Sequence, residues 1–165
     1  MFAFDSIDPD SLVRLCAALL AAGAIGIERD WRRMPTGFRT LGLVGLGSCA
    51  AVIAALKAGD TDGFSRVAQG VVTGIGFLGA GVIVQGQRVR DVKGLTTAAA
   101  IWLSASIGLL CGAGHFMLAF ATATLALIVL LADAVIDPGK NDRERADSGT
   151  DTDNRPKGAK KPRAP

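Results

Sequence analysis

The sequence predicts an all-α membrane protein, a polytopic bundle of about five transmembrane helices. Half of its 165 residues are hydrophobic, and the mean hydropathy is +0.38. Of the 33 charged residues, 18 basic and 15 acidic, only Arg14 and Asp133 lie within five long apolar runs. Each run is close to the roughly 20 residues that a helix needs to cross a hydrocarbon layer. None alternates with the period of a barrel strand, and none has the polar face of a helix in a water-soluble protein.

The five runs give, in chain order, the helices that we expect. They cover residues 12–27, 40–56, 67–84, 95–112 and 116–136. Polar and charged residues return in the segments 28–39, 57–66 and 85–94, and a short connection at 113–115 separates the last two runs. The transmembrane domain is therefore expected at 12–136, after a polar segment at 1–11. Residues 137–165 carry many charges without apolar periodicity, which is typical of a disordered basic tail.

Basic residues predict the orientation, because cytoplasmic segments carry an excess of Lys and Arg. The segments 28–39, 85–94 and 137–165 together hold 15 basic residues, whereas 1–11, 57–66 and 113–115 hold two. We therefore expect the N-terminus outside and the tail in the cytoplasm, after five crossings. Four crossings with one re-entrant run are the alternative, but they would place segments rich in basic residues on both sides of the membrane.

The third run contains GIGFLGAG at residues 74–81, with the Gly-x-Gly-x-x-Gly spacing of a dinucleotide-binding turn. That turn requires a strand before it and an acidic residue about 20 positions later. Here the glycines lie in the middle of an apolar run, where no isolated strand is stable in lipid. The nearest downstream acid, Asp91, comes too early. We therefore interpret the glycines as helix-packing residues, since small residues let membrane helices approach closely.

The glycines of the third run fall on two faces of a helix that turns about 100° per residue. Gly70, Gly74 and Gly81 share one face, and Gly76 and Gly79 share the opposite one. We therefore expect this helix between two neighbours at the centre of the bundle. Small-residue pairs on the other helices offer matching surfaces: Ala22 with Gly26, Gly47 with Ala51, and Gly108 with Gly112.

Three stretches of the chain resemble the N-terminal membrane domain of the MgtC/SapB family. They are GAIGIERDWRRMPTGFRTLGLVGLG, RVAQGVVTGIGFLGAGVIV and VKGLTTAAAIWLSASIGLLCGAG, in the family's order. The resemblance implies a bacterial inner-membrane protein linked to survival in low magnesium and inside macrophages, and restraint of the proton-driven ATP synthase. The chain departs from the family pattern at Leu41, where members often carry a polar residue. Its tail does not resemble the folded cytoplasmic domain that some members carry.

Ionisable and polar residues at a bundle edge are candidates for function. On the predicted cytoplasmic side the candidates are Glu28, Arg29, Arg39, Thr40, Asp91, Thr96 and Thr97. We expect them to converge in one polar mouth, with an ion pair between Glu28 and Arg39, and the resemblance adds weight to both positions. Headgroup anchoring is the alternative for Arg29, and capping of the fourth helix is the alternative for the two threonines.

These features predict a regulatory membrane protein that acts by binding membrane partners, with the ATP synthase as the partner that the resemblance implies. A small ion or Mg²⁺ channel or transporter is the alternative, but no run has an acid or base near its centre and the halves show no repeat. An enzyme is not expected, because no constellation for intramembrane chemistry occurs. We expect no cofactor, metal site or nucleic-acid partner, and a homo-oligomer is left open.

Overall fold

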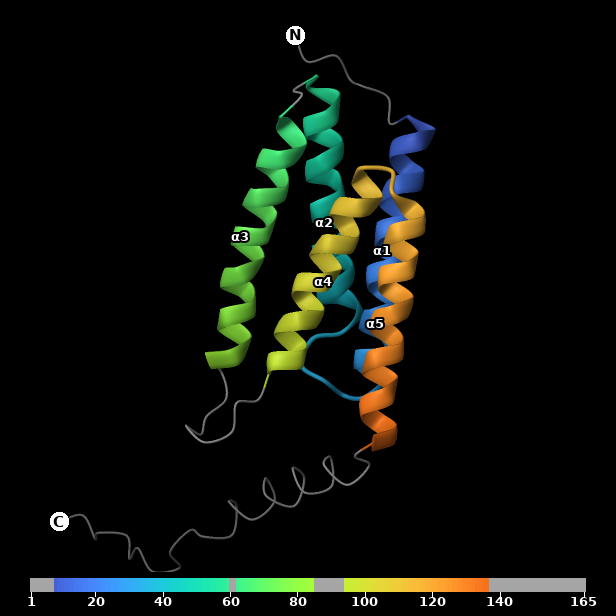
Figure 1. The fold of residues 1–165 in the computed structure, drawn as a ribbon, viewed down its shortest axis with the longest axis vertical. Helices are drawn as coiled ribbons and strands as arrows, with labels where there is room; N and C mark the ends of the chain where they lie inside the picture. The colour runs from blue at the N-terminus through green and yellow to red at the C-terminus, as the bar shows by residue number, and fades with distance from the viewer. Residues whose placement is uncertain (1–7, 60–61, 85–93, 137–165) are drawn as a thin grey trace, which may run out of the picture. The chain divides into compact units, whose positions relative to one another are not determined.

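A computed structural model describes residues 8–59, 62–84 and 94–136. In these ranges the regular elements are helices: α1 (Pro9–Trp31), α2 (Phe38–Lys57), α3 (Gly63–Val84), α4 (Leu95–Gly112) and α5 (Phe116–Ile136) (Figure 1). The predicted all-α fold is confirmed. The predictions for the tail and for Asp91 concern residues outside the described ranges. The chain falls into two compact units, residues 1–127 and 128–165, whose boundary lies within α5.

The lengths of the helices agree with a membrane protein. By length and composition, α1, α2, the stretch Gly63–Ile83 of α3, and α4 are each able to span a bilayer. The corresponding apolar part of α5 is shorter, Phe116–Ala132, among the residues that could be searched. α1 and α3 begin several residues before the apolar runs at 12–27 and 67–84, because the helical backbone continues into the polar flanks.

α1, α2 and α4 form the core of the first unit, where small residues allow close helix contacts. A Cβ atom on Gly45 of α2 would lie 2.6 Å from Ala22 Cβ of α1. A Cβ atom on Gly108 of α4 would collide with the Gly45 carbonyl oxygen, and one on Gly112 would lie 2.8 Å from the Cys49 carbonyl oxygen. The backbones of α2 and α4 therefore touch, as expected for membrane helices that associate through small residues.

The prediction that the third helix lies at the centre of the bundle is wrong. α3 packs on α4 and α2 and lies at the outer edge of these helices (Figure 1). A Cβ atom on Gly70, Gly74, Gly76 or Gly81 would meet nothing within 4 Å, so these four glycines do not pack within the described chain. Gly79 is buried and would only make an ordinary contact, 3.6 Å, with Ala98. The covered face of α3 instead follows Ile75 and Gly79, one turn apart, because neighbours lie on one side only.

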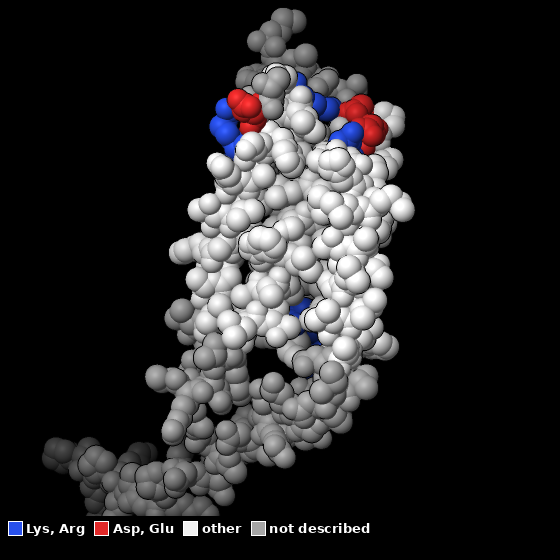
Figure 2. Space-filling view, viewed as in Figure 1, with Lys and Arg blue, Asp and Glu red and all other residues white. Residues whose placement is uncertain are grey.

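The surface of the described bundle is mostly uncharged. Figure 2 shows acidic and basic side chains gathered at the end where α1 begins and α2 ends, with white surface below them. Large apolar side chains are exposed on several helices, including Leu43 on α2 and Phe77 on α3, which is 82% exposed. Apolar surface of this extent is typical of contact with lipid or another protein.

Ion pairs and hydrogen bonds connect three helices at the end of the bundle where α1 begins. Asp8 caps α1 by accepting a hydrogen bond from the Ser11 amide at 3.2 Å, and Pro9 occupies the first turn. Lys57, at the end of α2, donates to Asp8 Oδ1 at 2.5 Å. Arg14 of α1 donates to the Gly112 carbonyl oxygen, the last residue of α4, at 2.7 Å. The start of α1 is thus joined to the ends of α2 and α4.

We predict that this end of the bundle loses stability in acid. The hydrogen bond from Lys57, followed by that from Ser11, holds the pKa of Asp8 well below its ordinary value. A carboxyl whose folded-state pKa is lowered stabilises the fold above its unfolded pKa, and this contribution is lost as the pH falls toward the folded pKa. The thermal midpoint of the wild type should therefore fall more between pH 5 and pH 3 than that of Asp8→Asn. Parallel curves for the two proteins would contradict this assignment.

Candidate functional site

A buried arginine joins the end of α1 to the start of α4. Arg29 lies in the last turn of α1 and is 2% exposed. Its Nη2 atom donates a hydrogen bond to the Thr97 hydroxyl oxygen in the first turn of α4. The Nε atom of the same guanidinium is buried and has no hydrogen-bond partner. A buried charge is stable only where partners compensate for the lost water, so this guanidinium is incompletely satisfied.

Glu28, the residue before Arg29, adds a buried carboxylate at the same end of α1. Glu28 is 8% exposed and forms an ion pair with the Nε atom of Arg32, one helical turn later. Neither carboxylate oxygen accepts a hydrogen bond of good geometry. The loop that follows contributes Thr36, which is buried with its hydroxyl unpartnered. We call Glu28, Arg29, Thr36 and Thr97 the buried polar cluster.

The loop between α1 and α2 is held by a cap that the sequence analysis did not identify. The Asp30 side chain accepts a hydrogen bond from the Phe38 amide at 2.9 Å and so caps the start of α2. A Cβ atom on Gly37 would collide with this carboxylate, so only glycine leaves room for it. Gly26 of α1 leaves room for the Phe38 backbone in the same way. No spacing rule signals this cap, because the capping side chain comes from the preceding helix.

The structure brings three of the seven predicted residues together and leaves three exposed. Glu28, Arg29 and Thr97 are buried at the same end of the helices. Arg39, Thr40 and Thr96 are exposed, and Asp91 lies outside the described ranges.

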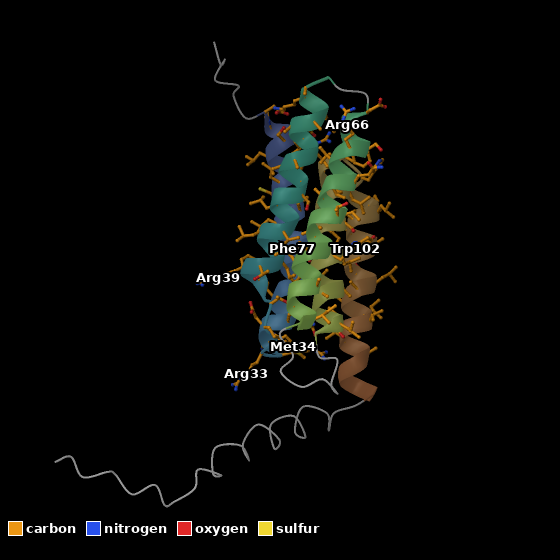
Figure 3. The ribbon with its side chains drawn as sticks, turned by 90° about the vertical axis from the view of Figure 1, so that its left-hand side faces the viewer. Arg33, Met34, Arg39, Arg66, Phe77 and Trp102 are labelled. Atoms are coloured by element: carbon orange, nitrogen blue, oxygen red, sulfur yellow. The ribbon has the colours of Figure 1, made fainter. Side chains whose placement is uncertain are left out.

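The predicted ion pair between Glu28 and Arg39 is wrong. Glu28 pairs with Arg32, and the Arg39 side chain extends away from the helices (Figure 3). The residues of α2 that are buried include Leu41 and Gly45. Arg39 precedes Leu41 by two residues, a rotation of about 200° around the helix, which places it on the opposite face. The sequence identified the right end of the bundle but not the rotation of α2.

The described residues include no group of three or more His, Cys, Asp or Glu side chains placed to hold a metal ion. The buried polar cluster instead combines one carboxylate, one guanidinium and two hydroxyl groups, with the Arg32 guanidinium beside them. Its charged groups offer both donors and acceptors to a polar ligand or to a partner protein.

Comparison with known proteins places the cluster inside a shared region. A family model described as the MgtC family matches residues 15–137. The chain is 43% identical to the protein MgtC of Salmonella typhimurium over 125 residues. These aligned residues make up 76% of this chain and 52% of the relative. It is 41% identical over 128 residues to the putative magnesium transporter YhiD of Escherichia coli K12, covering 72% of this chain and 58% of that protein.

An uncharacterised protein of Synechocystis is 39% identical over 123 residues, which cover 74% of this chain and 52% of that protein. The chain thus spans about half the length of the curated relatives it matches. No solved structure shows significant similarity. All four residues of the buried polar cluster fall within the region that the family model matches.

Proposed function

Because this chain belongs to the MgtC family of membrane proteins, we propose that it is a regulatory protein that binds other proteins of the bacterial inner membrane. Its role would be in adaptation to low magnesium and in survival inside host cells, with the ATP synthase as a candidate partner. The buried polar cluster would be the part of the molecule that sets the conformation of the binding end.

The position of the buried charges supports binding rather than ion conduction. Among the described residues, the charged residues that are buried are Glu28 and Arg29, both at the C-terminal end of α1. The middle of the described core is filled by alanine, glycine and aliphatic side chains, with the thiols of Cys49 and Cys111 and the hydroxyls of Ser48 and Ser104. Ion transporters typically place ionisable groups near the bilayer midplane and interrupt helices there. The five described helices run without interruption.

We also propose that the buried polar cluster faces the cytoplasm. The segment 28–39, which contributes Glu28, Arg29 and Thr36 to this end, belongs to the basic set that the distribution of Lys and Arg assigns to the inner side. A cytoplasmic cluster would lie where soluble signals and the cytoplasmic parts of membrane enzymes can reach it.

Affinity capture tests the binding function. The full chain with an affinity tag would be extracted in mild detergent from cells grown at low and high magnesium. We expect the wild type to recover subunits of the ATP synthase or another membrane protein at low magnesium. Arg29→Gln should lose that partner, because the orientation of the helix ends depends on the Arg29–Thr97 contact.

Arg33→Gln is the matched control, since Arg33 follows α1 at the same end but its side chain is exposed and extends away from the helices (Figure 3). This control should retain the partner. Recovery of no membrane protein beyond a tag-only sample would contradict the binding function, as would equal loss in both variants. Size-exclusion profiles would establish that each variant is folded.

A small Mg²⁺ channel or transporter is the second candidate, and the observation in its favour is the name of the YhiD relative, a putative magnesium transporter. Flux into proteoliposomes loaded with a Mg²⁺-sensitive dye separates the two candidates. Binding alone predicts no flux above protein-free liposomes. Flux that Glu28→Gln abolishes and Arg33→Gln leaves intact would replace the binding function with transport.

A further inference from the structure

The guanidinium group of Arg29 has no ion-pair partner among the described residues. Two carboxylates and two guanidinium groups lie at this end, those of Glu28, Asp30, Arg29 and Arg32, and the Asp30 carboxylate accepts from the Phe38 amide. The ion pair joins Glu28 to Arg32, so no carboxylate forms an ion pair with Arg29 among the described residues. The hydrogen bond from Arg29 goes to a neutral hydroxyl, and its Nε atom donates to no group.

The first turn of α4 adds positive potential at the same point. A helix N-terminus carries a partial positive charge, and its first amides have no partner within the helix. The residue at the cap position of α4 is Gly94, which has no side chain to accept hydrogen bonds from them. Thr97, which accepts the hydrogen bond from Arg29, is the third residue of this helix. The buried guanidinium therefore lies against the positive end of an 18-residue helix.

An anion placed between the Arg29 guanidinium and the N-terminus of α4 would be attracted by both, most strongly in a low-dielectric environment. Part of this region is open, since Leu95 and Thr96 in the first turn of α4 are exposed. Figure 2 also shows basic atoms in a recess lower on the same face, apart from the charged end. The arrangement thus combines an accessible helix N-terminus with a buried, incompletely partnered guanidinium behind it.

We propose that this end of the bundle binds a phosphate oxyanion, held by the first amides of α4 and by the Arg29 guanidinium. A phosphate group has enough acceptor oxygens, in a tetrahedral arrangement, to accept hydrogen bonds from both groups at once. Helix N-termini and guanidinium groups both commonly bind phosphate in proteins. The phosphate would come either from the headgroup of an anionic lipid or from a soluble phosphate compound.

This inference deepens the proposed function and rests on it for the role of the cluster, but binding is measured without any partner protein. The delipidated full chain in dodecyl maltoside, a detergent without phosphate, would be titrated in two arms at constant ionic strength. One arm adds inorganic phosphate, and the other adds a short-chain phosphatidylglycerol. The readout is the thermal unfolding midpoint, which rises saturably when a ligand binds the folded state alone.

In the wild type we expect a saturable rise in at least one arm. A response to inorganic phosphate identifies a soluble source, and a response to phosphatidylglycerol alone identifies a lipid headgroup. Arg29→Gln should weaken the apparent affinity by about tenfold to a hundredfold, the effect of losing a hydrogen bond to a charged group. Arg33→Gln should keep the affinity of the wild type, because its side chain lies outside the cluster.

Arg29→Lys covers the case in which Arg29→Gln does not fold. It retains the charge but loses the planar fork, so we expect a folded protein with a weaker affinity. The inference is wrong if the wild type shows no saturable response in either arm, or if Arg33→Gln weakens binding as much as the Arg29 variants. Phosphate binding without any captured partner would remove the proposed function and leave this site in place.

Discussion

Gly108→Leu is expected to lower the free energy of unfolding by about 3 kcal/mol or more, the upper end of the usual range for overpacked cores. A side chain at this position of α4 has no room. Its Cβ atom would collide with the Gly45 carbonyl oxygen and lie 2.8 Å from Ser48 Cβ on α2. Since these contacts involve backbone, α2 and α4 would have to separate. Thermal unfolding of the purified protein in detergent measures the loss.

Gly76→Leu on α3 is the matched control, because a Cβ atom there meets nothing within 4 Å. We expect a midpoint close to that of the wild type. Gly76→Ala should be neutral or slightly stabilising, since alanine favours a helix over glycine by about 1 kcal/mol. Equal losses for Gly108→Leu and Gly76→Leu would show that the small residues of α2 and α4 are not the contact that holds the helices together.

Glu28→Gln is expected to produce the second large loss, about 3–5 kcal/mol, the range for breaking one side of a buried ion pair. Glutamine keeps the shape of the side chain, so the effect isolates the charge. Without the carboxylate, the guanidinium groups of Arg29 and Arg32 would face each other uncompensated. Denaturant unfolding in mixed micelles gives the difference in free energy.

Arg39→Gln should change stability by less than about 0.5 kcal/mol, because an exposed side chain without a specific contact contributes little. The double variant Glu28→Gln with Arg32→Gln should recover part of the loss, as expected for two residues that interact directly. An equal loss in the Arg39 and Glu28 variants would restore the pairing that the sequence suggested and contradict the contact with Arg32.

The positions of the helices could be predicted from the sequence because the length of an apolar run is set by the thickness of the bilayer. α4 and α5 cover the predicted residues 95–112 and 116–136. The neighbours of each helix could not be predicted in this way. Glycines at intervals of four mark a smooth face, but the same face suits contact with another helix or with lipid. For α3 the sequence pattern alone could not separate these cases, and four of its glycines, Gly70, Gly74, Gly76 and Gly81, lie open within the described chain.

For the candidate site, too, the sequence predicted which residues lie at one end of the bundle but not which of them pair. Glu28, Arg29 and Thr97 could be placed at one end because their segments share the basic character of one side of the membrane. Their pairing depends on the rotation of each helix, which a run of leucine, alanine and glycine does not specify. The Asp30 cap on α2 depends on the path of a short loop, for which the spacing of residues carries no signal.

The open glycines of α3 make this helix a suitable position for spectroscopic labels. The chain has three cysteines, of which Cys49 and Cys111 are buried and Cys16 is exposed. Replacing Cys16 with alanine would therefore remove the accessible thiol without touching the core. A cysteine introduced at Gly76 would then carry a fluorophore or spin label into open space. Distances from that label to a second one on α2 would report directly whether α3 moves when phosphate or a partner protein binds.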